Sequence, residues 1–71
     1  MSDYVKVKAS SPVGRDFTGG TARRDIRKGE QFWALARDRR VVEGYVEVFD
    51  GPGGAALFRL PVGALDWDPA V

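Results

Sequence analysis

The sequence contains neither cysteine nor histidine. Without cysteine the chain forms no disulfide and offers no thiolate to a metal, so a reducing compartment, the cytoplasm, is its expected location. Without histidine it lacks the commonest general base, which excludes the usual catalytic triads and zinc sites. The glycine-rich stretch 51–54 lacks the Lys-Ser/Thr pair of a phosphate loop, and Asp66 and Asp68 are too few for a calcium loop. We therefore expect a non-enzymatic protein with no catalytic residue, no metal and no cofactor.

Long apolar runs are also missing. None approaches the roughly 20 residues of a membrane-spanning helix, and Met1-Ser2-Asp3 does not begin a signal peptide, so no membrane contact is expected. The 71 residues are 44% hydrophobic, 30% charged and 11% aromatic, which is an ordinary globular composition. We expect one small domain over 1–71, with a frayed tail at 69–71.

Charge is distributed unevenly along the chain. The formal net charge is +1, but ten of the eleven basic residues lie within 1–40, which carries +5, while 41–71 carries −4. This asymmetry either steers an acidic partner to one side of the molecule or holds the two halves together. The isoelectric point of about 8.1 is modest beside the values above about 9 that are typical of dedicated nucleic-acid binders.

Apolar and polar side chains alternate at Tyr4–Ala9, which predicts a half-buried strand. Residues 10–20 are rich in Gly, Pro and Ser and are expected to form a long loop anchored by Phe17. Further strands are predicted at 30–37, 41–49, 55–60 and 65–68, with turns at 38–40 and 50–54 and one helical turn at 61–64. Five short strands with glycine-rich turns indicate an all-β chain closed into a small barrel.

Two stretches resemble SH3 domains. Residues 26–35, Ile-Arg-Lys-Gly-Glu-Gln-Phe-Trp-Ala-Leu, are similar to the diverging turn and second strand of that family. Residues 60–65, Leu-Pro-Val-Gly-Ala-Leu, resemble the segment in which a proline and a short helical turn lead into the final strand. Residues 41–44 fall where SH3 domains carry Trp-Trp-x-Gly/Ala. The resemblance covers 26–68 and implies a five-stranded SH3-like barrel with a long loop between the first two strands.

The aromatic groove of peptide-binding SH3 domains is not repeated in this sequence. Of its residues only Pro61 remains, with Val41 at the Trp position and Ala64 at a Tyr position, and 13–24 is basic and lacks an Ala-Leu-Tyr-Asp-Tyr stretch. Proline-rich peptides of the usual kind are therefore not the expected ligand.

A weaker similarity is to the plasmid-borne trimethoprim-resistant dihydrofolate reductases, which resemble residues 60–65. Their pore-lining Val-Gln-Ile-Tyr is replaced here by Leu-Phe-Arg-Leu at 57–60, so the similarity does not extend to their activity.

The SH3-like arrangement predicts that basic side chains of two neighbouring loops flank one groove, with two exposed aromatic residues as apolar anchors. The candidate partner-binding residues are Arg23, Arg24, Arg27, Lys28, Trp33, Arg37, Arg39, Arg40 and Tyr45. Two alternatives stay open: the bases only solvate the loops, and Trp33 packs under the long loop on Phe17. Trp67 is predicted to close the barrel, and Arg59 to pair with Glu43 or Glu47 across a hairpin.

These features predict a non-enzymatic protein-binding or assembly module that recognises an acidic protein surface. The alternative is nucleic-acid binding by the same bases. Burial of Trp33 between two copies would also favour a homo-oligomer. An SH3-like chain with arginine-rich loops is typical of phages and other mobile elements, which suggests a virion-assembly part or an inhibitor of a host enzyme.

Overall fold

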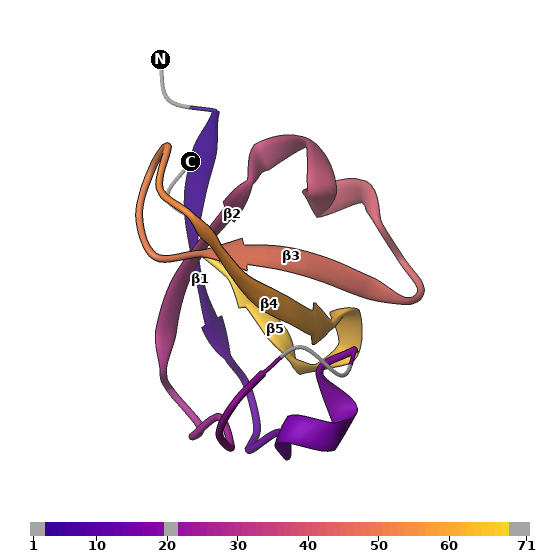
Figure 1. Ribbon diagram of the computed structural model, residues 1–71. Coiled ribbons are helices and arrows are strands. Elements are labelled where there is room, and N and C mark those ends of the chain that lie inside the picture. Colours follow the sequence, from indigo (N-terminus) through magenta and orange to yellow (C-terminus); the bar gives the residue numbers. More distant parts are fainter. Residues whose placement is uncertain (1–2, 20–21, 69–71) are drawn as a thin grey trace.

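The computed structural model describes residues 3–19 and 22–68 and is shown in Figure 1. The tail predicted at 69–71 lies outside these residues. Five strands form: β1 (Tyr4–Ala9), β2 (Gln31–Leu35), β3 (Tyr45–Phe49), β4 (Ala56–Pro61) and β5 (Leu65–Trp67). The helical elements are short 3-10 turns: η1 (Arg15–Phe17), η2 (Ala36–Arg40) and η3 (Val62–Ala64). No α-helix occurs in the described part, so the all-β prediction is confirmed, and no described helix is long and apolar enough to cross a membrane.

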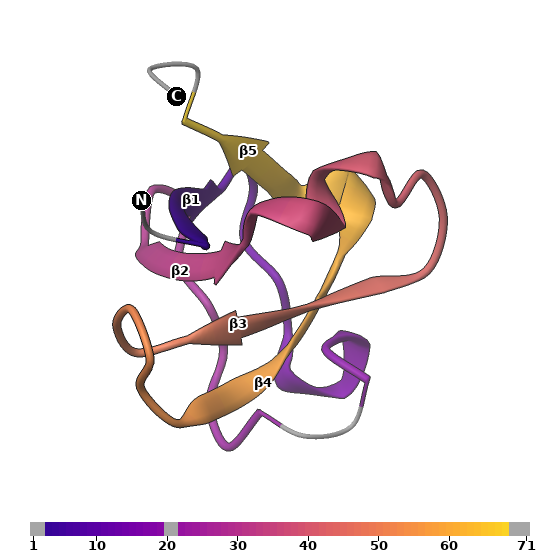
Figure 2. The same cartoon turned by 90° about the horizontal axis from the view of Figure 1, so that it is seen from above.

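The strands form one antiparallel sheet in the order β4-β3-β2-β1-β5 (Figure 2). The prediction of a closed sheet is wrong, because among the described residues no ladder joins the outer strands β4 and β5. Two features oppose closure: β5 is only three residues long, and β4 ends at Pro61, which has no amide proton for a further ladder. The sheet bends instead at β2, which pairs with β3 only through Trp33↔Phe49 and Ala34↔Val48.

Side-chain alternation on the first two strands follows the prediction. In β1, Val5, Val7 and Ala9 are buried and the intervening lysines are exposed. In β2, Phe32 and Ala34 are buried, and Trp33 between them is half-buried. Alternation of this kind holds the register of the strands, because a slip by one residue would move every apolar side chain to the solvent face.

The core lies between the inner faces of the bent sheet. Its fully buried large side chains include Ile26, Val46, Val48 and Leu60, and Phe32 meets Phe58 edge to face with 5.2 Å between ring centroids. Because Ile26 comes from the connection between β1 and β2, this connection contributes directly to the core.

The third strand is shorter than predicted. Residues 41–44, which were included in the predicted strand, precede β3, and Val42 is 84% exposed. Gly44 explains the difference: its φ of +89° is left-handed, which a regular strand does not accommodate. Its carbonyl oxygen accepts a hydrogen bond from Val62 N at 3.0 Å, so this break is joined to the start of η3.

Phe17 does not anchor the connection between β1 and β2, contrary to prediction, because it is 70% exposed. Its neighbour Thr18 is fully buried instead. Its hydroxyl donates to the carbonyl oxygen of Arg15 at 2.7 Å and accepts from the amide of Ala22 at 3.2 Å. A small side chain with two hydrogen bonds fits this tight turn, whereas a phenyl ring does not.

Two local predictions near the C-terminal half are confirmed. The turn at 50–54 is closed by a 2.9 Å hydrogen bond from Gly54 N to Gly51 O. The helical turn before the last strand is η3, which begins directly after Pro61.

Candidate partner-binding surface

The predicted basic residues form two groups at opposite ends of β2 (Figures 1 and 2). One group precedes β2 within segment 22–30, and the other lies on η2 after it. The strand separates the groups in both views, so the structure does not bring them together around one groove. Each group therefore has to be judged by its own contacts.

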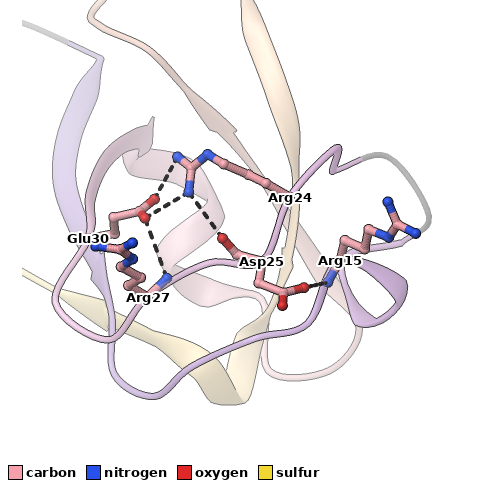
Figure 3. A network of polar contacts seen from close by, with 5 residues as sticks. All are labelled: Arg15, Arg24, Asp25, Arg27 and Glu30. Atoms are coloured by element: carbon pink, nitrogen blue, oxygen red, sulfur yellow. Dashed lines mark hydrogen bonds and ion pairs between the residues drawn. The ribbon is translucent and has the colours of Figure 1, made fainter.

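Arg24 in the first group is committed to an internal ion pair (Figure 3). Its Nη1 and Nη2 donate to Oε1 and Oε2 of Glu30, both at 2.8 Å. Glu30 Oε1 also accepts from the amide of Arg27 at 3.4 Å. The hydrogen bonds from Arg24 hold the pKa of Glu30 below its ordinary value of 4.5. Arg24 thus stabilises the segment before β2, and a partner could bind its guanidinium only by competing with Glu30.

A second contact fixes the two limbs of the β1–β2 connection to each other. Asp25 Oδ1 accepts from the amide of Arg15 at 3.0 Å, while the guanidinium of Arg15 points away from this network in Figure 3. Beside it, Val13 and Ile26 form a two-way backbone bridge. In the described part of the chain, no partner is found for the exposed side chains of Arg23 and Lys28, which leaves them available to a ligand.

On η2, Arg39 is also used internally. Its Nη2 donates to the carbonyl oxygen of Asp68 at 2.8 Å, and its guanidinium lies 5.6 Å from the ring centroid of Trp67. Arg37 makes only a long contact of 3.9 Å with Asp38, and exposed Arg40 has no partner among the described residues. Arg39 therefore ties η2 to the end of β5, and Arg40 is the base of this group that is open to a ligand.

Trp33 points to the outer face of the sheet, as the alternation predicted. It is half-buried, and Lys6 Nζ lies 5.8 Å from its ring centroid. Phe17 is too exposed to cover it, so the alternative that Trp33 packs on Phe17 finds no support. The lysine chain covers part of the indole, which makes Trp33 a poorer apolar anchor than predicted.

Tyr45 is the better anchor. It is 49% exposed at the start of β3 and lies directly opposite Pro61 in the β3–β4 register. Residues opposite each other in an antiparallel pair share a face, so ring and proline form adjoining apolar walls. The resemblance to SH3 domains had put Val41 at the position of a groove Trp, whereas the structure places Tyr45 beside the one remaining groove residue, Pro61.

The connection between β1 and β2 reaches this site. A Cβ atom on Gly19 would lie 3.9 Å from Tyr45 Cδ1 and 3.6 Å from Arg59 Nε. Arg59 is opposite Glu47, so it shares the outer hairpin face with Tyr45. Gly19 also has a φ of +71°, so any other residue here would be strained.

Two residues of this region were missed in the sequence. Phe17 is 70% exposed on η1, and Val42 is 84% exposed in the segment before β3. Phe17 is close in the chain to Gly19, which borders Tyr45, and Val42 is close in the chain to Tyr45 itself. The available signal was a bulky apolar residue next to polar residues or glycine: Phe17 lies between Asp16 and Thr18, and Val42 directly precedes Glu43 and Gly44. The Tyr45 surface, as we call it, consists of Phe17, Val42, Tyr45, Arg59 and Pro61.

Within the described ranges no group of three acidic side chains is placed to hold a metal ion. Comparisons of the chain with protein-family models, with curated proteins and with solved structures gave no match.

Proposed function

We propose that this chain is a non-enzymatic protein-binding or assembly module of SH3-like fold, and that it contacts its partner with the Tyr45 surface. The observation that carries the proposal is the half-exposed Tyr45 ring opposite Pro61. Five antiparallel strands and a 3-10 turn between β4 and β5 support the SH3-like part of the proposal. The absence of cysteine supports a cytoplasmic site of action.

Tyr45 has the properties of an interface hot spot. Tyrosine buries a large, stiff ring at low entropic cost and keeps a hydroxyl for a hydrogen bond, and it is enriched among residues that dominate binding energies. Phe17 and Val42 expose further apolar area on neighbouring segments. Such surrounding side chains exclude water from a central anchor when a partner docks.

The partner we propose presents acidic side chains. Arg23 follows Phe17 closely in the chain, and Arg40 ends η2 just before Val42. Each base is therefore close in the chain to one exposed apolar residue of the Tyr45 surface. Guanidinium groups pair bidentately with carboxylates, and no internal contact of the described residues competes for these two. Residues 1–40 carry a net charge of +5, which steers an acidic partner towards the molecule.

The test is affinity capture from nuclease-treated host lysate with the wild-type chain and two variants, followed by mass spectrometry. Tyr45→Ala removes the proposed anchor, and Leu57→Ala is the matched control because Leu57 is 42% exposed on the same hairpin but outside the Tyr45 surface. A protein retained by the wild type and by Leu57→Ala, but lost with Tyr45→Ala, supports the proposal. Equal retention by both variants contradicts it.

Nuclease treatment also separates the competing function. Binding to nucleic acid through Arg23, Lys28 and Arg40 would disappear after treatment and would weaken log-linearly with salt. A protein contact anchored by Tyr45 would survive the treatment and respond much less to ionic strength.

A further inference from the structure

The outer face of β1 and β5 carries a four-charge cluster, which consists of Lys6, Lys8, Asp66 and Asp68. Lys8 lies opposite Asp66 in the β1–β5 register, with 3.9 Å between Nζ and Oδ2. The amide of Asp68 donates to the carbonyl oxygen of Lys6 at 3.0 Å, which continues the same register by one more pair. The cluster is thus a rectangle with a lysine row on β1 and an aspartate row along the β5 side.

These four side chains line one open cavity of about 250 Å³. On the other side of β1 lies β2, where Gln31 is opposite Lys8 and Trp33 is opposite Lys6. The surface is therefore a recessed centre with charges of both signs around it and a half-buried indole at one side.

Partners with charge of one sign do not fit this cluster. A nucleic-acid backbone or an acidic protein patch that approached the lysine row would meet Asp66 and Asp68 a strand spacing of about 5 Å away. A basic partner would meet Lys6 and Lys8 in the same way. The cluster requires a partner with two opposite rows of charge at the same spacing, and a second copy of this chain has those rows by construction.

We propose that the four-charge cluster is a self-association surface on which two copies dock face to face about a two-fold axis parallel to β1 and β5 and between them. This axis sets Lys6 of each copy against Asp68 of the other, and Lys8 against Asp66. An axis perpendicular to the strands would set Lys6 against Lys8, so the charges select one of the two arrangements. Docking would also bring Trp33 to the margin of the interface.

The expected association is weak and sensitive to salt, because exposed ion pairs contribute little individually and are screened over about 8–10 Å at physiological ionic strength. It does not involve Tyr45, so the dimer would present two copies of the Tyr45 surface to a partner. If the chain does not self-associate, the proposed function of the Tyr45 surface is unaffected.

The experiment uses two charge-reversed variants of the full chain. Lys6→Asp with Lys8→Asp makes the cluster wholly negative, and Asp66→Lys with Asp68→Lys makes it wholly positive. Arg23→Asp with Lys28→Asp is the matched control for dimerisation, because it makes the same net charge change as the lysine variant at residues outside the four-charge cluster. Sedimentation velocity at low and high salt measures each protein alone and the two cluster variants mixed in equal amounts, and circular dichroism checks that all are folded.

We expect the wild type and the control to dimerise with concentration at low salt, and each cluster variant to dimerise at least about tenfold more weakly. The equal mixture of the two cluster variants should restore dimers of one copy of each. A wild type that stays monomeric up to about 1 mM overturns the proposal. So does a mixture no more associated than its components, which is the result if these charges pair only within one chain. If reversal unfolds a variant, the single changes Lys8→Asp and Asp66→Lys replace the doubles, with the same comparison.

Discussion

Replacing Thr18 with valine tests whether hydrogen bonding, rather than apolar packing, holds the turn beside the Tyr45 surface. Valine keeps the branched shape of threonine and replaces the hydroxyl with a methyl group. In the folded chain that hydroxyl serves two backbone groups, the carbonyl of Arg15 and the amide of Ala22. Without it the amide of Ala22 loses this partner, and the carbonyl oxygen of Arg15 keeps only the longer backbone hydrogen bond of 3.4 Å from Thr18 N.

The cost follows from these two groups. A buried backbone group left without a partner costs about 1–3 kcal/mol, and the loss of one hydrogen bond from a group that keeps another costs about 0.5–1.5 kcal/mol. Because the amide of Ala22 and the carbonyl of Arg15 are only partly buried, we take about 1 kcal/mol for each, which is about 2 kcal/mol in total. In a domain of this size 1 kcal/mol lowers Tm by about 4–8 °C, so the expected loss is about 8–16 °C. Thr18→Ser keeps the hydroxyl and loses one methyl group, which costs about 0.8 kcal/mol.

Urea unfolding and thermal unfolding of the wild type and both variants provide the measurement. The order of stability should be wild type, then Thr18→Ser, then Thr18→Val, with unchanged urea m-values. If the valine variant is as stable as the serine variant, the hydroxyl contributes nothing and the reasoning is refuted.

Three further changes probe other contacts of the described residues. Arg24 lowers the pKa of Glu30, so the stability that this pair contributes is present above pH 4.5 and is lost as pH falls through the pKa of the folded state. Glu30→Gln should therefore make the stability, measured by urea unfolding between pH 3 and pH 6, depend less on pH. An unchanged pH dependence would contradict the assignment. Arg39→Lys should lower stability by about 0.5–1 kcal/mol and shift the fluorescence of Trp67, whereas an unaltered emission spectrum would show that the stacking is absent in solution. In Gly44→Ala the added Cβ atom would have no other atom within 4 Å, so only the left-handed backbone of this residue should lower the free energy of unfolding, by about 1–2 kcal/mol. Thermal unfolding measures this loss, and an unchanged stability would mean that the turn has relaxed.

Local patterns in the sequence predicted the elements that are encoded by residues close together in the chain. The alternation in Tyr4–Ala9 was sufficient for β1, because one face of that strand is buried and the other is not. The turn at 50–54 and η3 after Pro61 depend on glycine and proline geometry, which is also local. These features required no knowledge of the rest of the fold.

Contacts between distant segments were beyond such patterns. Arg39 looked like any exposed base, and only the fold brings it to Asp68, 29 residues later. Val42 has a strand-forming side chain, but Gly44 sets the true start of β3. Phe17 and Thr18 were misjudged because size predicts burial on average, whereas here the smaller residue satisfies the backbone of the turn.

The bases of the candidate site illustrate the same limit. Spacing along the chain gave the correct exposed residues, but it could not tell that Arg24 is paired with Glu30 or that β2 separates the two groups. Tyr45 was identified as an exposed aromatic, and its position opposite Pro61 became visible only with the β3–β4 register.

The pairing of β1 with β5 has a consequence for how this chain folds. The β3–β4 hairpin joins residues close in sequence, so its loop closes rapidly at little entropic cost. The ladder that sets Val7 against Trp67 closes nearly the whole chain, and pairing at such long range slows folding. During synthesis the first strand therefore has no partner on one edge until residue 67 has emerged from the ribosome, so the hairpin is the part able to form first and β5 completes the sheet last.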